Sequence, residues 1–178
     1  MSNPLYDEIR AFIGFGPEDH ANLKALAPVI EKRGAGVTSY FYAILGGNPT
    51  TAALIEGRVD RLKPTHSRWM GGLVAGDYGD TWFDAQVRIG QVHVAMGISP
   101  LHVELTFGIL RDKLGEAVHE EIADAASAAA YSRSMVKALD ISLALVNHAY
   151  AEERLHRLSN FTGFSRKLIE NCINKTAK

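Results

Sequence analysis

Residues 88–98, RIGQVHVAMGI, decide how this sequence is interpreted, because they centre a histidine, His93, in an apolar segment with helical spacing. Four residues lie three or four positions from His93 and share its face of the expected helix: Ile89, Gly90, Met96 and Gly97. This face is apolar, and its two glycines leave room for a flat, bulky partner. An imidazole buried there alone costs about 1–3 kcal/mol, so a backbone carbonyl or a bound group should satisfy it.

The overall composition indicates a single-domain cytoplasmic protein. The chain has 178 residues, 47% of them hydrophobic, and a formal net charge of −1, which gives no basic surface for nucleic acid. A single cysteine, Cys172, excludes a disulfide framework within the chain and a multi-cysteine zinc site, and it fits a reducing cytoplasm. The N-terminus lacks the apolar core of a signal peptide, and the least charged run, 89–103, is too short to cross a bilayer.

Apolar residues recur at helical spacing along the whole chain, and no segment alternates with a period of two. This predicts an all-α fold of about eight helices: 4–15, 17–33, 37–45, 49–56, 59–73, 80–96, 100–122 and a last helix from about 131 toward the C-terminus. We expect Gly34–Gly36 to separate the second helix from the third, and Pro64 to lie inside the fifth. The second half of the last helix, 152–178, carries an apolar face that needs a dimer partner or a continuation of the chain.

His66 is a second histidine on an apolar helix face, so its imidazole also needs a polar partner. It lies on the most regular apolar stripe of the sequence: Val59, Leu62, His66, Trp69 and Leu73. Either histidine alone would suit a core histidine, but a metal cofactor between apolar walls explains both. Haem fits best, because a flat macrocycle needs apolar walls and an imidazole that reaches its iron. Zinc fits less well, because these faces lack cysteines and additional carboxylates.

The chain resembles the globin domain of the globin-coupled sensors. The matching segments are Phe41-Tyr42, Val59–Lys63 leading to Arg68-Trp69, and Ile89–Ile98, and the short first helix also agrees. The resemblance covers most of residues 1–155. It implies a globin-like fold with an extra N-terminal helix and a long C-terminal helix. Residues 1–155 would form a haem-binding sensor domain, and residues 156–178 would extend the last helix or begin a linker to an output domain outside this chain.

The resemblance also implies partners and roles for individual residues. The cofactor would be haem b, the ligand a diatomic gas (O2, CO or NO), and the assembly a homodimer through the last two long helices. His93 matches the proximal iron ligand, Tyr42 the distal tyrosine that hydrogen-bonds bound oxygen, and Leu62 an apolar distal residue. Further cofactor contacts are expected from six residues: Phe41, Trp69, Ile89, Val92, Met96 and Ile98.

His66 departs from the family pattern, because an apolar residue is expected one turn beyond Leu62. It could be a sixth, distal iron ligand, which predicts bis-histidyl haem in the absence of gas, or a free histidine that lines the pocket. We expect a sensor without catalytic activity of its own. A redox carrier or a gas-consuming globin is the first alternative, and a globin-fold domain without haem is another, against which the presence of His93 and Tyr42 argues.

A ferritin-like di-iron bundle is an alternative of another class. Glu116 with His119, and Glu153 with His156, both form the E-x-x-H pattern that such sites use. Glu116 and His119 fall opposite the apolar stripe of their helix, however, which predicts that they face solvent. We expect five histidines to be solvated: His20, His102, His119, His148 and His156.

Overall fold

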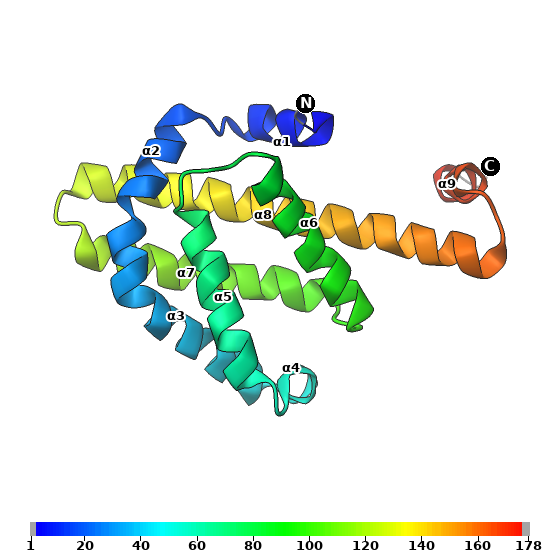
Figure 1. Cartoon of the computed structure of the whole chain (residues 1–178), viewed down its shortest axis with the longest axis horizontal. Coiled ribbons are helices and arrows are strands. Elements are labelled where there is room, and N and C mark those ends of the chain that lie inside the picture. Colours follow the sequence, from blue (N-terminus) through cyan, green and yellow to red (C-terminus); the bar gives the residue numbers. More distant parts are fainter. Residues whose placement is uncertain (1–2, 176–178) are drawn as a thin grey trace.

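The computed structural model describes residues 3–175, which form nine helices and no strands (Figure 1). The helices are α1 (Pro4–Ile13), α2 (Pro17–Ala25), α3 (Ala27–Gly47), α4 (Pro49–Ile55), α5 (Val59–Leu73), α6 (Asp80–Ala95), α7 (Pro100–Glu121), α8 (Ala125–Thr162) and α9 (Arg166–Asn174). The predicted all-α fold is confirmed. Within the described range, no helix is long and apolar enough to cross a membrane.

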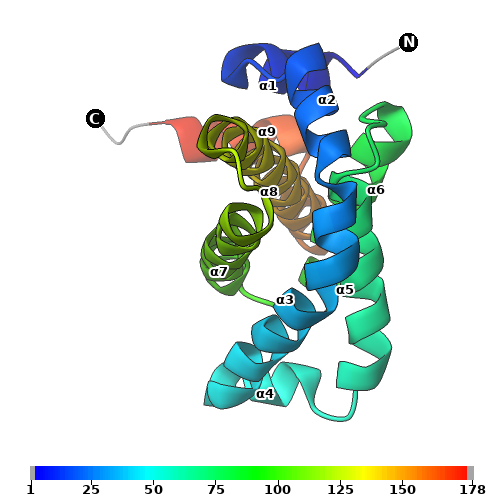
Figure 2. The ribbon, with the colours of Figure 1, turned by 90° about the vertical axis from the view of Figure 1, so that its left-hand side faces the viewer.

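The helix α8 is the spine on which the other helices are arranged. α7 runs antiparallel beside it, and α1, α2 and α6 also pack on it (Figures 1 and 2). On the other side of the molecule, α3 packs against both α5 and α7. α5 and α6 therefore follow one another in the sequence but rest on different supports, α5 on α3 and α6 on α8.

The core is built from apolar residues of α7 and α8 that meet the shorter helices. Its completely buried large side chains include Leu23, Leu114, Leu139, Ile141 and Leu145. Burying a side chain of this size contributes about 1.5–3 kcal/mol relative to leaving it exposed. The two long helices thus hold the positions of the short helices that cross them.

The boundary between the second and third helices differs from the prediction. The chain breaks at Leu26, and α3 then continues through Gly34–Gly36, which we expected to be a separator. Pro28 lies in the first turn of α3, where its missing N–H costs nothing, so the helix begins there. Gly34 is buried, and a Cβ on it would make only an ordinary contact of 3.5 Å with Met70 of α5; the helix continues through it because α3 packs on α5 and α7, despite the low helix propensity of glycine.

The end of the last helix also differs from the prediction. α8 stops at Thr162, and Gly163 adopts the left-handed conformation (φ 72°), with its N–H bonded to the Ser159 carbonyl. The chain then turns back, and Arg166 of α9 pairs with Glu152 of α8 through two contacts of 2.5 and 2.7 Å. Residues 156–178 therefore do not form one continuous helix, and residues 176–178 lie outside the described range.

Gly90 has a different role from the one its sequence position indicates. It is buried against α8, where an added Cβ would lie 2.6 Å from both the Ala149 Cβ and the Val146 carbonyl oxygen. Gly97 has φ 69° and ends the turn after α6. The two glycines thus serve helix packing and helix termination, and the expectation of a bare glycine face for a flat partner is wrong.

Replacing Gly90 with alanine is expected to destabilise the protein by about 1–3 kcal/mol, because the methyl group has no space between α6 and α8. Urea unfolding of Gly90→Ala and wild type would measure the difference. Gly36→Ala is the matched control, since Gly36 lies inside α3 with no atom within 4 Å of its added Cβ. It should raise stability by roughly 0.5–1 kcal/mol. Equal stability of Gly90→Ala and wild type would contradict the close approach of α6 and α8.

An aromatic cluster joins α1 and α2 to the rest of the molecule. The Tyr6 hydroxyl donates to the Tyr78 carbonyl at 2.9 Å, and the His20 ring lies 5.0 Å from Phe15 and 4.8 Å from Tyr78, between ring centroids. The His20 Nε2 is buried without a partner, and burial, followed by the nearby Arg10, lowers the pKa of its imidazole. His20 is therefore part of the packing, and the expectation that it is solvated is wrong; Nδ1 of His102 is likewise buried and unpaired.

This environment predicts a pH dependence of stability. The folded pKa of His20 lies below its unfolded value of about 6.5, so its contribution is complete above that pH and is lost as the pH falls through the folded pKa. His20→Phe, which keeps a ring in the cluster, should lose less stability than wild type between pH 7 and pH 5 in urea unfolding. His119→Gln, at an exposed site, should follow wild type; a His20→Phe curve parallel to wild type would rule this origin out.

Candidate haem site

His93 lies in the last turn of α6 and is half-buried. Its Nδ1 is buried without a hydrogen bond of ordinary geometry. Burial lowers the pKa of the His93 imidazole, and the carbonyl of Ile89, one turn earlier, partly offsets that effect. Beside it, Val92 and Met96 are 45% and 41% exposed, which is high for large apolar side chains. His93 is thus a neutral imidazole bordered by apolar surface that the protein itself leaves uncovered.

His66 lies in the middle of α5 inside a set of aromatic rings. The Phe41 ring stacks on the imidazole at 4.4 Å, Trp69 lies at 5.6 Å, and Tyr42 meets it edge-on at 5.9 Å, all between centroids. Nδ1 is 3.0 Å from the Thr38 hydroxyl, whereas Nε2 is buried with no partner. Burial lowers the pKa of the His66 imidazole to about 4, so the ring is neutral at pH 7.

The other predicted residues divide into two groups. Phe41, Trp69, Ile89 and Ile98 are partly buried and pack against the core. The Ile98 carbonyl accepts a 2.9 Å hydrogen bond from the Tyr150 hydroxyl, which fixes the chain just after α6 to α8. Tyr42 and Leu62 are half-buried, and burial raises the pKa of the Tyr42 phenol. The structure therefore brings Phe41, Tyr42, His66 and Trp69 into contact, while among the described residues the His93 ring stacks on no other aromatic ring.

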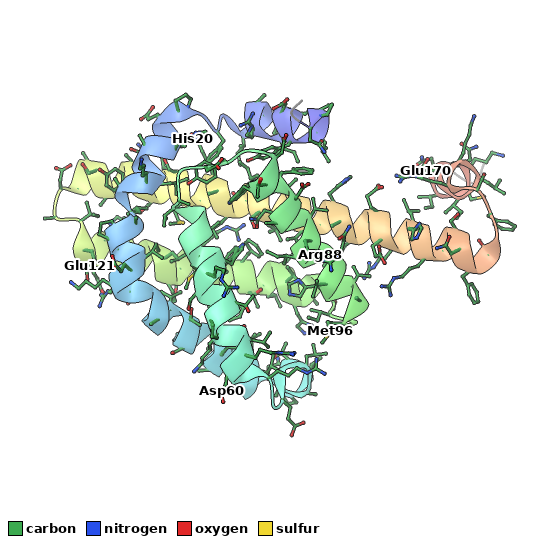
Figure 3. All side chains as sticks on the ribbon, in the orientation of Figure 1. His20, Asp60, Arg88, Met96, Glu121 and Glu170 are labelled. Atoms are coloured by element: carbon green, nitrogen blue, oxygen red, sulfur yellow. The ribbon has the colours of Figure 1, made fainter. Side chains whose placement is uncertain are left out.

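Two links connect the α5 wall with the α6 wall. At one end, the Trp69 Nε1 donates to the Gln86 Oε1 at 2.9 Å, and the Ser142 hydroxyl of α8 donates to the same oxygen at 2.6 Å. At the other end, Arg58 Nη1 lies 3.8 Å from the Met96 sulfur. Figure 3 shows Met96 at the end of α6 and Asp60 at the start of α5 on the same side of the molecule. The histidines lie along the helices between these links.

Removing the Gln86 amide should be costly, because Trp69 and Ser142 would each lose a buried partner. Gln86→Ala is expected to destabilise the haem-free protein by about 2–5 kcal/mol in urea unfolding. Ser142→Ala keeps the Trp69–Gln86 bond and should cost only about 1 kcal/mol. Equal losses in the two variants would show that Gln86 does not join three helices.

Sequence reasoning missed Thr38, Gln86 and Ser142, and it missed the contact of Phe107 with Trp69, whose ring centroids lie 5.9 Å apart. Thr38 and Gln86 carried a usable signal, because each is a polar residue on the apolar stripe of its helix, one turn before Tyr42 and two turns before His93 respectively. Both are 2% exposed.

The structure excludes the di-iron alternative. Glu116 is exposed and pairs with Lys113 at 2.5 Å, and His156 is exposed and bonded to Asn160 at 3.0 Å. Over the described part of the chain, no three His, Cys, Asp or Glu side chains are grouped to hold a metal ion. One neutral imidazole on each of two apolar walls instead suits a metal whose remaining ligands belong to its cofactor, so the residues present fit haem.

These features define an all-α globin with a haem site. The protoglobin family model matches residues 2–156, and the chain belongs to that family. The fold is similar to the globin domain of a globin-coupled sensor from Geobacter sulfurreducens (TM-score 0.77, 27% identity, 81% of this chain and 96% of that one). It is also similar to the ferric globin domain of DosC from E. coli (TM-score 0.71, 18% identity, 82% and 99%).

Curated relatives agree in sequence. A flavohaemoprotein from Bordetella pertussis is 32% identical over 124 residues, and the haem-based aerotactic transducer HemAT from Halobacterium salinarum is 26% identical over 176 residues. These alignments cover 64% and 92% of this chain but only 30% and 36% of the relatives. The chain is thus a globin domain of the globin-coupled sensor type, and its cofactor is haem.

Proposed function

We propose that this globin domain senses a diatomic gas, or redox state, at a haem b held between α5 and α6. The observation that carries the proposal is the pair of neutral imidazoles, one on each wall: Nε2 of His66 is buried with no protein partner, and His93 is bordered by apolar side chains that the protein leaves uncovered. Haem, when bound, supplies an iron that can bind O2, CO or NO.

On the proximal side, His93 would hold the iron through Nε2. Its Nδ1–H would then donate to the carbonyl of Ile89, which already favours the protonated ring. Such an outer hydrogen bond fixes the tautomer and the ring orientation and raises the basicity of the ligand. Val92, Met96, Ile89 and Ile98 supply the apolar surface around it, which keeps water from the iron.

On the distal side, His66 and Tyr42 share the space above the macrocycle with Leu62. In the absence of gas, His66 Nε2 would occupy the sixth position, and a gas must displace it, so apparent gas affinity falls by the fraction of molecules with His66 released. The Tyr42 hydroxyl would be the donor for a bound diatomic ligand. Phe41 and Trp69 contact the His66 ring and set its position in the haem-free protein.

The signal would pass to the output domain through α8. Gln86 joins both haem walls to Ser142 on that helix, so a shift of α5 or α6 is transmitted to the spine. α7 and α8 also carry exposed large apolar residues, which are Leu101 and Leu105 on α7 and Val136, Leu158 and Phe161 on α8. We infer a homodimer through these two helices, and an output domain C-terminal to the globin, in keeping with relatives of which the alignments cover only 30% and 36%. The single exposed cysteine, Cys172, fits a cytoplasmic location.

A redox carrier or a gas-consuming globin is the second candidate. Bis-histidyl ligation favours electron transfer, and flavohaemoproteins are among the relatives. Gas binding that releases His66 would support sensing, whereas ligation that resists gas in both oxidation states would support electron transfer. As a sensor, this segment is proposed to have no catalytic activity of its own.

The absorption spectrum of the ferric protein tests the ligation. Wild type reconstituted with hemin is expected to be low-spin, because two imidazoles complete the coordination of the iron. His66→Ala should be high-spin, since the sixth position loses its nitrogen. His102→Ala is the control, because His102 lies outside both walls and also has a buried, unpaired Nδ1. A spectrum unchanged in His66→Ala would leave His66 as a residue that lines the pocket.

A further inference from the structure

Thr38 lies against His66 at the interface between α3 and α5. It is 2% exposed, and its Oγ1 is 3.0 Å from the His66 Nδ1. One turn later on α3, Phe41 stacks on the imidazole with 24° between the ring planes. Two residues of one helix therefore fix this ring, since Phe41 sets its plane and Thr38 sets the direction of Nδ1.

The Thr38 hydroxyl can control which imidazole nitrogen carries the proton. A neutral imidazole has one N–H and one lone pair. If the proton is on Nδ1, it is donated to Thr38, and Nε2 presents a lone pair, which is the form that binds a metal. If the proton is on Nε2, a buried N–H is left with no acceptor, since Nε2 has no protein partner. Orphaned buried N–H groups are the rarer kind in native proteins.

Ser67 gives the hydroxyl of Thr38 the partner that this arrangement requires. Once Thr38 accepts from Nδ1, its own proton needs an acceptor, and the Ser67 Oγ lies 3.3 Å away. The chain of donors then runs from the imidazole to Thr38 and from Thr38 to Ser67. Of the polar side-chain atoms in this hydrogen-bonded series, only Nε2 of His66 lacks a partner.

We propose that Thr38 is a positioning residue that selects the Nδ1–H tautomer of His66 and thereby makes Nε2 the atom offered to the haem iron. The inference rests on the proposed haem site between α5 and α6. It adds a partner for the distal histidine that corresponds to the one Ile89 provides for His93. Loss of an outer partner of a metal-bound histidine typically costs 10–100-fold in metal affinity.

The tautomer can be measured on the haem-free wild-type chain. Nitrogen-15 NMR of labelled histidine, at pH 7 where His66 is neutral, is expected to show the His66 proton on Nδ1. His66→Gln identifies its signals by their disappearance. A proton on Nε2 would overturn the proposal, because Thr38 would then be donating to Nδ1. This measurement needs no haem and no Thr38 variant, so it remains decisive if a variant fails to fold or if the wild type does not take up haem.

Variants of Thr38 test the consequence for ligation. Thr38→Val keeps the side-chain shape without the hydroxyl, and it should lower the ratio of six- to five-coordinate ferric haem by about 10–100-fold. Thr38→Ser should restore most of that ratio, and Ser67→Ala, which removes only the acceptor of the Thr38 proton, should lie between wild type and Thr38→Val. Equal ratios in Thr38→Val and wild type, or equal losses in Thr38→Val and Thr38→Ser, would overturn the proposal. A wild type that takes up no haem would refute the haem site itself.

Discussion

The central constraint on this molecule is the cost of keeping two neutral imidazoles unpaired inside apolar walls. A buried polar atom without a partner costs about 1–3 kcal/mol, a large share of the 5–15 kcal/mol that keeps a domain folded. His66 and His93 each carry such an atom, on helices that are consecutive in the chain but rest on different supports. Iron bound between these walls would give the unpaired Nε2 of His66 a ligand bond, and ligation of His93 through Nε2 would direct its Nδ1–H to the Ile89 carbonyl, which is why we propose a haem pocket here.

The remaining helices fix the positions of these two walls relative to one another. Gly90 lets α6 approach the backbone of α8, and α5 rests on α3. Gln86 then ties both walls to Ser142 through one amide oxygen. Because α8 supports α6 and contacts Gln86, a change at the iron has a short physical route to the helix proposed to form the dimer and lead to the output.

Much of this could be predicted from the sequence, where the signal was local. The apolar periods around His66 and His93 gave the helices that carry them to within one or two residues, and the motifs they belong to gave the family. The errors concerned contacts made across the fold. Gly34 and Gly36 were expected to break a helix because propensity is a local quantity, whereas the packing of α3 on α5 and α7, which keeps the helix continuous, is a tertiary one. The same limit hid the role of Gly90, the bond from Thr38 to His66 and the burial of His20.

Haem capture by His93 is the most direct test of this account. Haem-free wild type, His93→Ala and His102→Ala would be titrated with hemin and followed at the Soret band. The account predicts that wild type and His102→Ala bind one haem per chain, and that His93→Ala loses more than the roughly 10–100-fold affinity associated with an outer partner. A His93→Ala protein that binds hemin as tightly as wild type, with the same spectrum, would contradict it.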